Sequence, residues 1–395
     1  MTVTNGQYDV AIVGAGPAGS SAAIRLAHAG LSVALVEQKR FPREKLCGEF
    51  VSPECLWHFD ELGVMPAIRG IGGPNIYETV FYSKRGNSVS ICSEWFGNGG
   101  SIALGISRAA MDLKLIERAA ELGVDVRTET SVTGVVSLGD AVTGLKTKPA
   151  NGVESELRAK VYIDATGRTR ALARRFEPKD LTKAAASSVA FKTHLRGAQI
   201  NAHSCEIYSY NNGYGGCNRV EDDLFNLCFI VSSADARYMK SDPERVLREV
   251  VFRNERAAAV LRRVEIVKPW HAVPIERFGR GELVPANGLF TIGDSAAFID
   301  PFTGSGMLMA LESAKIAAEV IVDSRDRNAH FDHVSENYRE KYSAAFDRRL
   351  RFCSMLRHAA SIPFWSGAMI AALRFSPFLR QTVARATRSN AAISK

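Results

Sequence analysis

A glycine-rich turn between two short apolar stretches constrains the fold of this chain more than any other feature of its sequence. The first stretch, Tyr8–Val13 (YDVAIV), has the β-branched, apolar character of a buried parallel strand. It leads directly into residues 14–19 (GAGPAG), which are followed by a helix of small residues over 20–29. Gly30 ends that helix, and a second apolar strand follows over 31–36 (LSVALV). This order predicts a βαβ unit of the Rossmann type.

Each glycine of this turn has a predicted mechanical role. Gly14 permits the tight turn, Gly16 allows the backbone to approach a pyrophosphate, and Gly19 allows the helix to pack closely on the strand. The N terminus of the helix offers free N–H groups and the positive end of a dipole to the phosphates. Glu37 follows the second strand, 18 residues after Gly19, where its carboxylate can accept hydrogen bonds from ribose hydroxyls. The unit is therefore predicted to bind a dinucleotide.

Two later strands end in turns of the kind that brings backbone close to a dinucleotide. The strand over 161–164 (VYID) runs into residues 165–168 (ATGR). The strand over 289–292 (LFTI) runs into a glycine and then Asp294. A carboxylate on such a glycine turn can hold the ribityl hydroxyls of a flavin cofactor.

A second glycine pair lies in residues 301–306 (PFTGSG), directly before a predicted helix over about 307–322. Gly304 and Gly306 leave room for a flat ring against the backbone, and the helix N terminus then points at that ring. Because a reduced flavin carries negative charge at this edge, the helix dipole stabilises it. A nicotinamide enzyme has no evident use for this segment, so the predicted cofactor is FAD.

The glycine motif occurs once in the chain, since no second copy is followed by a strand and an acid. A flavoprotein with a built-in NAD(P)H domain normally needs two such units. The flavin is therefore expected to receive its electrons either from NAD(P)H that binds transiently or from a separate reductase.

Between the flavin segments, the pattern changes to strands joined by turns. Strands are predicted over 79–89, 188–195, 205–210 and 224–231, with a glycine-rich turn over 211–217. We expect them to form an antiparallel sheet that roofs the flavin and binds a small apolar substrate. Such a roofed cavity argues against the non-enzyme alternative, which is a flavin-binding electron carrier.

The sequence assigns no catalytic residue. His203 and His271 are candidate proton donors because histidine titrates near neutral pH, although a histidine at a strand edge more often has no chemical role. No group of residues has the spacing of a metal site. For Cys47, which has no neighbouring cysteine, packing against the flavin is favoured over redox chemistry.

Taken together, these segments resemble the FAD enzymes of the para-hydroxybenzoate hydroxylase fold, a group that includes aromatic monooxygenases, geranylgeranyl reductases and flavin halogenases. The resemblance covers roughly residues 8–325 in pieces and is strongest to the geranylgeranyl reductase-like branch. Residues 41–48 (FPREKLCG), 52–53 (SP), 61–63 (ELG) and 107–112 (SRAAMD) carry the resemblance to that branch.

The resemblance also implies individual FAD contacts. Arg108 would reach the adenosine or pyrophosphate part of the cofactor. An arginine at the start of a helix is a poor partner for the helix dipole, which suits an anion nearby. With the motif residues, the predicted FAD site comprises Gly14, Gly16, Pro17, Ala18, Gly19, Glu37, Cys47, Gly48, Arg108, Val132, Asp294, Pro301, Gly304, Gly306 and Met307.

The protein is thus predicted to be an FAD-dependent oxidoreductase, in the first instance an NAD(P)H-driven monooxygenase that hydroxylates an apolar aromatic, polyketide or isoprenoid-type molecule. The alternative is a C=C reductase like the geranylgeranyl reductases, but Gly216 stands where those enzymes usually carry a tryptophan. Halogenation ranks third, because the halogenase stretch W-x-W-x-I-P is matched only by residues 269–274 (PWHAVP), with neither tryptophan in register.

Charge and cysteine content limit the partners and the compartment. The seven cysteines are odd in number and form no C-x-x-C pair, which fits a reducing cytoplasm. The first residues do not resemble a signal peptide, and no apolar run reaches the roughly 20 residues that span a bilayer. The net charge is +8, and nine basic residues without any acid follow from Arg348 onward, so residues 1–347 carry 8 − 9 = −1. No nucleic-acid-binding surface is therefore expected.

Residues 345–388 are predicted to form basic helices with apolar faces, broken at Pro363 and Pro377. One interpretation is a helical lid on the core with its arginines in water. The other is an interfacial segment that makes peripheral contact with an anionic membrane. The lid interpretation is favoured.

The predicted fold class is α/β, with a Rossmann-type FAD-binding domain, an inserted antiparallel substrate sheet and C-terminal helices. The expected boundaries are 1–75, 101–180 and 281–330 for the FAD-binding domain, 76–100 and 181–280 for the substrate domain, and 331–395 for the C-terminal helical region.

Overall fold

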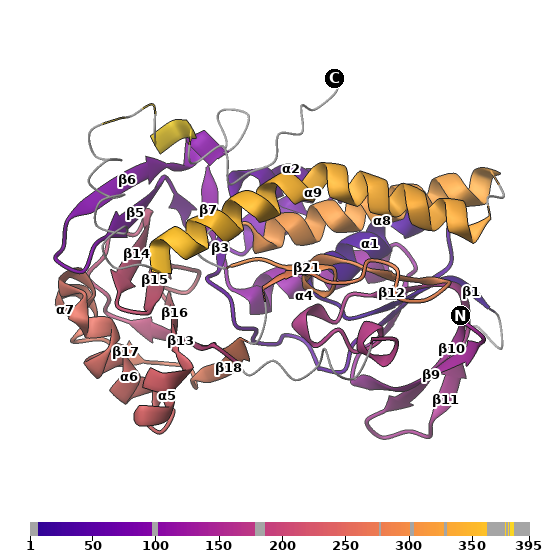
Figure 1. Ribbon diagram of the computed structural model, residues 1–395, viewed down its shortest axis with the longest axis horizontal. Coiled ribbons are helices and arrows are strands. Elements are labelled where there is room, and N and C mark those ends of the chain that lie inside the picture. The colour runs from indigo at the N-terminus through magenta and orange to yellow at the C-terminus, as the bar shows by residue number, and fades with distance from the viewer. Residues whose placement is uncertain are drawn as a thin grey trace.

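The computed structural model describes residues 7–96, 102–177, 186–275, 278–300, 304–327 and 330–361, together with 376, 378 and 380–382. Figure 1 shows a parallel sheet in one half of the molecule and a larger mixed sheet in the other, with two long helices running along one side. The predicted α/β fold with a Rossmann-type unit is confirmed.

The parallel sheet has the strand order β20-β12-β1-β2-β8. Its strands are β1 (Tyr8–Val13), β2 (Val33–Val36), β8 (Asp125–Arg127), β12 (Ala159–Asp164) and β20 (Leu289–Thr291), and every neighbouring pair is parallel. Residues of β2 and β20 are buried throughout, as expected for a sheet that is covered on both faces. Because the strands are parallel, their carboxyl ends meet at one edge, where the ligands of such sheets bind.

Helices cover one face of this sheet. α1 (Pro17–His28) packs against both α4 (Arg108–Glu121) and α8 (Gly306–Arg327), and α2 (Pro53–Glu61) also packs against α8. α1 is built largely from alanines, serines and a glycine, so α8 can approach it closely.

The opposite face of the parallel sheet is covered by a second, smaller sheet. Its antiparallel strands are β9 (Thr130–Leu138), β10 (Ala141–Pro149) and β11 (Ser155–Leu157). Their apolar side chains form one buried cluster with those of β1 and β2.

The half predicted to bind the substrate, called the substrate sheet below, is an eight-stranded sheet with the order β17-β13-β16-β15-β14-β5-β6, in which β18 also pairs with β13. Its strands are β5 (Glu78–Tyr82), β6 (Ser88–Cys92), β13 (Ser188–Arg196), β14 (Ser204–Tyr210), β15 (Gly213–Arg219), β16 (Phe225–Ser232), β17 (Glu265–Ile266) and β18 (His271–Ile275). Three short helices, α5 (Ser233–Tyr238), α6 (Pro243–Glu249) and α7 (Glu255–Leu261), cover one face. The other face turns toward the FAD-binding half.

Three details of this sheet differ from the prediction. Residues 79–89 are not one strand but the hairpin β5–β6, because Gly86 adopts φ +75° and reverses the chain. Residues 213–217 belong to β15 rather than to a turn. The sheet is also not wholly antiparallel, since β14 pairs with β5 in parallel. The two strands are distant in sequence, and no local turn fixes their direction.

Short strands connect the two halves. β3 (Phe50–Val51) and β4 (Asn75–Ile76) both pair with β7 (Ala103–Gly105), and β19 (Gly279–Arg280) pairs with β21 (Ala297–Phe298). These pairs carry the chain between the parallel sheet and the substrate sheet, and they hold the loops that bound the predicted site.

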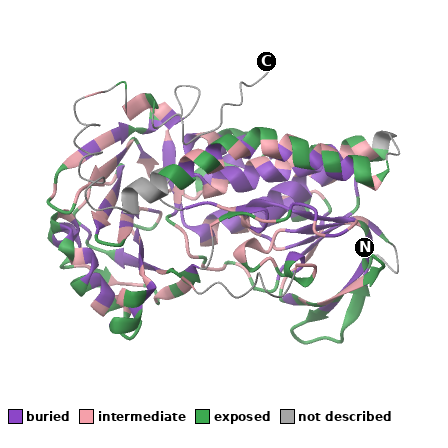
Figure 2. Ribbon diagram, viewed as in Figure 1, coloured by how far each residue is buried: buried purple, intermediate pink, exposed green. Residues whose placement is uncertain are grey.

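The helix α9 (Phe331–Ser361) packs against α8. Arg349 is only 3% exposed, and its Nη1 lies 3.0 Å from Oε2 of Glu312 on α8. Figure 2 shows buried and exposed residues alternating along the helix. The described part of the C-terminal region thus packs on the core, while the predicted breaks at Pro363 and Pro377 lie outside the described residues. No helix in the described ranges is long and apolar enough to cross a membrane.

Candidate FAD-binding site

The glycine turn between β1 and α1 has the geometry that its sequence predicts. Gly14 has φ +101°, and a Cβ atom on it would lie 2.3 Å from the carbonyl oxygen of Ala165. A Cβ atom on Gly19 would lie 1.8 Å from the oxygen of Gly14. Gly14 and Gly19 therefore cannot carry a side chain. Pro17 occupies the first turn of α1, where the absence of an N–H costs nothing.

Two guanidinium groups converge above Gly16. A methyl group placed on Gly16 would lie 3.6 Å from Nη2 of Arg108 and 3.7 Å from Nη2 of Arg43, with nothing else within 4 Å. This open space at the N terminus of α1 combines free N–H groups, the helix dipole and two cations. It fits the pyrophosphate of a dinucleotide.

The anion nearest to Arg108 is internal to the protein. Nε and Nη2 of Arg108 donate to Oδ1 and Oδ2 of Asp112 at 2.8 and 2.7 Å, and Arg43 Nη1 lies 3.2 Å from the same carboxylate. Burial would lower the pKa of Arg108, but the Asp112 carboxylate outweighs it and raises the pKa. Asp112 thus keeps Arg108 charged and aimed at Gly16, while the predicted contact of Arg108 with FAD remains a prediction. Arg43, which was not predicted, reaches the site through a side chain whose direction the sequence does not show.

Glu37 lies directly after β2 and is 7% exposed. Its Oε2 accepts a hydrogen bond from the N–H of Ala15 at 3.1 Å, and its Oε1 accepts one from the N–H of Lys39 at 3.0 Å. Arg43 Nη2 lies 3.4 Å from Oε2. The carboxylate is therefore fixed beside the glycine turn, where it suits ribose hydroxyls.

Asp294 lies at the carboxyl end of β20, next to the turn that follows β12. A Cβ atom on Gly167 would lie 4.0 Å from Cβ of Asp294, so the two predicted turns are adjacent. Ala18 contacts the same region, because a Cβ atom on Gly293 would lie 2.8 Å from its Cβ. Burial raises the pKa of the Asp294 carboxyl, and Arg168 and Lys45 oppose that shift from nearby.

The glycine pair before α8 differs in its two members. Gly304 has φ +61°, which disfavours any side chain. Gly306 begins α8, and a Cβ atom on it would meet no atom within 4 Å. Met307 packs partly buried against the core, and Pro301 lies outside the described residues. The helix itself extends from Gly306 to Arg327, beyond the predicted end at 322.

The remaining predicted residues lie in two places. Gly48 is exposed with open space around its Cα, and the Sγ of Cys47 accepts a hydrogen bond from the N–H of Glu49 at 3.4 Å. Both precede β3 in the loop that also carries Arg43. Val132 lies in β9 and packs against the cluster that contains the end of β1. The structure thus gathers the glycine turn, Glu37, Arg108 and Asp294 around the carboxyl edge of the sheet.

A cluster of apolar side chains, here called the apolar wall, joins β13, β15, β16 and β18 to residues outside the substrate sheet. It comprises Leu46, Ala190, Tyr214, Ile230, Ile275, Phe278 and Phe298. The Phe278 and Phe298 rings are stacked with centroids 5.1 Å apart. Tyr214 donates a hydrogen bond of 2.5 Å to Oδ1 of Asp300, just before the glycine pair of α8. Neither Tyr214 nor Asp300 was predicted, because the contact joins residues 86 positions apart.

The two candidate histidines lie at the margins of the sheet. His203 is exposed and its Nδ1 lies 2.8 Å from the carbonyl oxygen of Asn75. His271 is in the edge strand β18, opposite Lys192. Neither position indicates a chemical role for His203 or His271.

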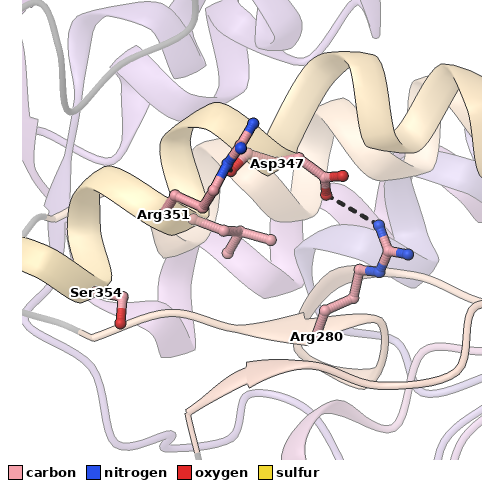
Figure 3. A pocket seen from close by; sticks show the side chains of 5 residues that line it. Arg280, Asp347, Arg351 and Ser354 are labelled. Atoms are coloured by element: carbon pink, nitrogen blue, oxygen red, sulfur yellow. Dashed lines mark hydrogen bonds and ion pairs between the residues drawn. The ribbon is translucent and has the colours of Figure 1, made fainter.

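Two further features of the described residues resemble sites. Glu44, Glu49 and His194 place ligand atoms within 4.8 Å of one another, but the Lys192 ammonium already lies 2.9 and 2.5 Å from the two carboxylates. A cavity of about 450 Å³ lies between α9 and β19, lined by Arg280, Asp347, Leu350, Arg351 and Ser354. Figure 3 shows the 2.9 Å ion pair between Arg280 and Asp347 across it. No predicted FAD residue lines this cavity.

Comparison with known proteins agrees with this geometry. The family described as FAD binding domain matches residues 7–323. A digeranylgeranylglycerophospholipid reductase of Methanosarcina mazei is 30% identical over 329 residues, which are 80% of this chain and 76% of the relative.

Two solved structures share the fold. The flavin-dependent brominase Bmp2 is 22% identical, with a TM-score of 0.80 over 97% of this chain and 93% of the brominase. A geranylgeranyl bacteriochlorophyll reductase-like protein from Thermoplasma acidophilum is 21% identical, with a TM-score of 0.80 over 96% and 95%. Binding of FAD therefore explains the glycine turn, the fixed carboxylate of Glu37 and the paired cations of Arg43 and Arg108. The chain belongs to the FAD-binding domain family and is an FAD-dependent oxidoreductase similar to the geranylgeranyl reductases.

Proposed function

We propose that the protein reduces a C=C bond of an apolar, isoprenoid-type substrate, with Tyr214 as the proton donor. The observation that carries this proposal is the hydrogen bond between Tyr214 and Asp300, at the junction of the apolar wall and the loop that leads to Gly304. Reduction of an isolated C=C bond consumes one hydride and one proton. Reduced FAD would supply the hydride, with both electrons; the protein must supply the proton and exclude water.

The residues of the site divide these tasks. Arg43 and Arg108 hold the pyrophosphate, and Glu37 and Asp294 hold the two sugar parts of the cofactor. The apolar wall binds the chain of the substrate and keeps water away from the reacting carbons. The phenol oxygen of Tyr214 transfers its proton to the substrate, and Oδ1 of Asp300, 2.5 Å away, fixes the position of that oxygen.

Monooxygenation, which the sequence favoured, is the second candidate. Two observations support it: the stacked rings of Phe278 and Phe298 form a flat wall that suits an aromatic substrate, and Gly216 leaves β15 without the tryptophan that geranylgeranyl reductases usually carry. In that case molecular oxygen is a substrate, whereas the reductase needs none.

The requirement for oxygen separates the two reactions. FAD-loaded protein is photoreduced without oxygen and mixed with a digeranylgeranylglycerophospholipid in detergent micelles. The reductase proposal expects anaerobic reoxidation of the flavin together with saturation of C=C bonds in the lipid. Product that forms only after oxygen is admitted, and that carries label from ¹⁸O₂, would overturn it in favour of the monooxygenase.

Tyr214→Phe tests the proton donor separately. We expect the anaerobic reoxidation rate to fall by about 10²–10⁴-fold, with unchanged FAD content. An unchanged rate would remove Tyr214 from the mechanism and leave the reaction class untouched.

The electron source is also a proposal. Because the chain carries one dinucleotide unit, NAD(P)H is expected to bind transiently or to act through a separate reductase. Anaerobic mixing with NADH or NADPH distinguishes these routes, since direct bleaching of the flavin supports the first and no bleaching supports the second.

A further inference from the structure

A largely buried group of charges joins the FAD-binding half to the substrate sheet. We call it the Glu49 cluster, and it consists of Glu44, Glu49, Lys192 and His194. The two glutamates lie in the loop of residues 41–49, here called the flavin loop because it carries Arg43, Cys47 and Gly48. Lys192 and His194 lie on β13, on the face that turns toward this loop. Glu49 and Lys192 are both 0% exposed.

The contacts inside the cluster are short and complementary. The Nζ atom of Lys192 lies 2.5 Å from Oε1 of Glu49 and 2.9 Å from Oε2 of Glu44, and it donates to the carbonyl oxygen of Lys45 at 3.2 Å. Nε2 of His194 lies 2.6 Å from Oε2 of Glu49. Burial alone would lower the pKa of Lys192, but the two carboxylates outweigh it and raise the pKa. The ammonium group therefore stays charged.

Glu49 connects three parts of the chain at once. Its Oε1 also accepts a hydrogen bond from the N–H of Arg108 at 2.9 Å, at the first residue of α4. Its carbonyl oxygen accepts hydrogen bonds from the N–H of Ile106 at 3.2 Å and from Nδ2 of Asn218, on β15, at 3.3 Å. The same residue has φ +53°, a conformation that disfavours a side chain and persists only where surrounding contacts enforce it.

Stability alone does not explain such a cluster. A buried ion pair is often no more stabilising than apolar residues of the same volume, because the charges lose their hydration. What this pair provides is a fixed geometry: Glu49 holds the start of α4, whose Arg108 side chain faces Gly16, and Lys192 ties that arrangement to the substrate sheet.

We propose that Glu49 is a positioning residue, with Lys192 as its counter-ion, that holds Arg108 and the flavin loop in the arrangement that binds FAD. Because Glu49 acts on cofactor binding, it has this role in either reaction of the flavin. It makes the flavin-facing side of β13 part of the FAD site, although neither Lys192 nor Glu49 belongs to a dinucleotide motif.

The test compares Lys192→Met, Glu49→Gln and the double variant that carries both changes. FAD is titrated into each apoprotein, and the midpoint potential and absorption spectrum of the flavin are measured at saturating FAD. Each single variant is expected to raise the Kd for FAD by at least about tenfold and to shift the potential. The double variant is expected to recover most of the affinity. The amide oxygen of the introduced glutamine can still accept from the N–H of Arg108, and no unpaired charge remains between the two exchanged residues.

Glu206→Gln provides the matched control. Glu206 is 2% exposed and pairs with Arg256 at 2.7 Å, on the same sheet but on the face covered by α7. Its loss is expected to lower stability and to leave the Kd for FAD, the potential and the spectrum unchanged.

His194→Gln keeps the result decisive if a single variant of Lys192 or Glu49 does not fold. It removes the ring and leaves the Lys192–Glu49 pair in place, so roughly a threefold to tenfold rise in Kd is expected, equivalent to about 0.7–1.4 kcal/mol. The proposal would be overturned if the Kd for FAD of Lys192→Met, of Glu49→Gln and of His194→Gln all lay within about twofold of the Kd of Glu206→Gln, with an unshifted midpoint potential.

Discussion

The two faces of strand β13 are both buried, yet different chemistry buries the side chains on them. On β13, Phe191 and Leu195 point toward the apolar core under α5–α7, while Lys192 and His194 point toward the flavin loop. The apolar face gains free energy simply from leaving water. The ionic face must instead pair every charge, since an unpaired one is costly. The first face therefore stabilises the sheet, and the second fixes where the sheet lies relative to the cofactor.

The largest expected effect comes from a substitution on the ionic face of β13. Lys192→Met should lower the free energy of unfolding by about 3–5 kcal/mol, because Glu49 is left charged and buried without its counter-ion. Urea unfolding followed by circular dichroism measures this loss. Glu49→Gln in the same chain should restore part of it, and a loss below about 1 kcal/mol would show that the pair is not held as the structure has it.

The carboxyl edge of the parallel sheet should respond in cofactor affinity. Glu37→Ala and Asp294→Ala each remove a charged acceptor worth about 1.5–3 kcal/mol, so the Kd for FAD should rise about 10- to 100-fold in each variant. Fluorescence titration of the apoprotein measures both constants. Unchanged affinity in both variants would mean that neither carboxylate contacts the cofactor.

The third comparison concerns His58, which is 3% exposed and whose Nδ1 lies 3.8 Å from Oε2 of Glu61, beyond hydrogen-bond distance. Burial, aided by the neighbouring charge of Arg25, lowers the pKa of His58 to about 3, and Arg25 Nη2 lies 3.2 Å from its Nδ1. The folded pKa is below the unfolded value of about 6.5, so the contribution of His58 is complete above pH 6.5 and is lost as the pH falls toward 3.

Each pH unit in that window should cost about 1.4 kcal/mol of unfolding free energy. Urea unfolding at about pH 6 and about pH 5 measures the slope, and His58→Gln should flatten it. An equally steep slope in that variant would assign the acid sensitivity to other groups.

The smallest expected effects distinguish the two faces of strand β16, which carries Ile230 and Val231. Ile230→Val, in the apolar wall, should cost about 0.5–1.5 kcal/mol of stability and should change the rate with an apolar substrate. Val231→Ala, in the core on the other face, should lower stability without altering that rate. Equal effects of both changes on the rate would show that the wall does not bind the substrate.

The cofactor half could be predicted from the sequence because its signals are local. Gly14 and Gly19 must be glycines since backbone atoms occupy the positions of their side chains, and Glu37 follows its strand at a fixed distance. Such constraints involve neighbours in the chain, so a motif records them.

The substrate half could be predicted only in part. The apolar alternation of β13 and β16 indicated strands, but the parallel pairing of β14 with β5 depends on residues more than 120 positions apart. The same holds for the contact of Glu49 with Lys192, and for that of Tyr214 with Asp300. Lys192, in the middle of the predicted strand over 188–195, is a signal that could have pointed to the Glu49 cluster, since lysine is almost never buried without a partner.

The strand order of the parallel sheet also has a consequence for synthesis of the protein. β1 and β2 leave the ribosome early, but β20, at the edge of the sheet beyond β12, ends at Thr291. At about 5–20 residues per second, the roughly 250 intervening residues take on the order of 10–50 s to make. During that interval the α1 face intended for α8 is uncovered, so a nascent chain that pauses in the substrate sheet is exposed to aggregation and is a candidate for chaperone binding.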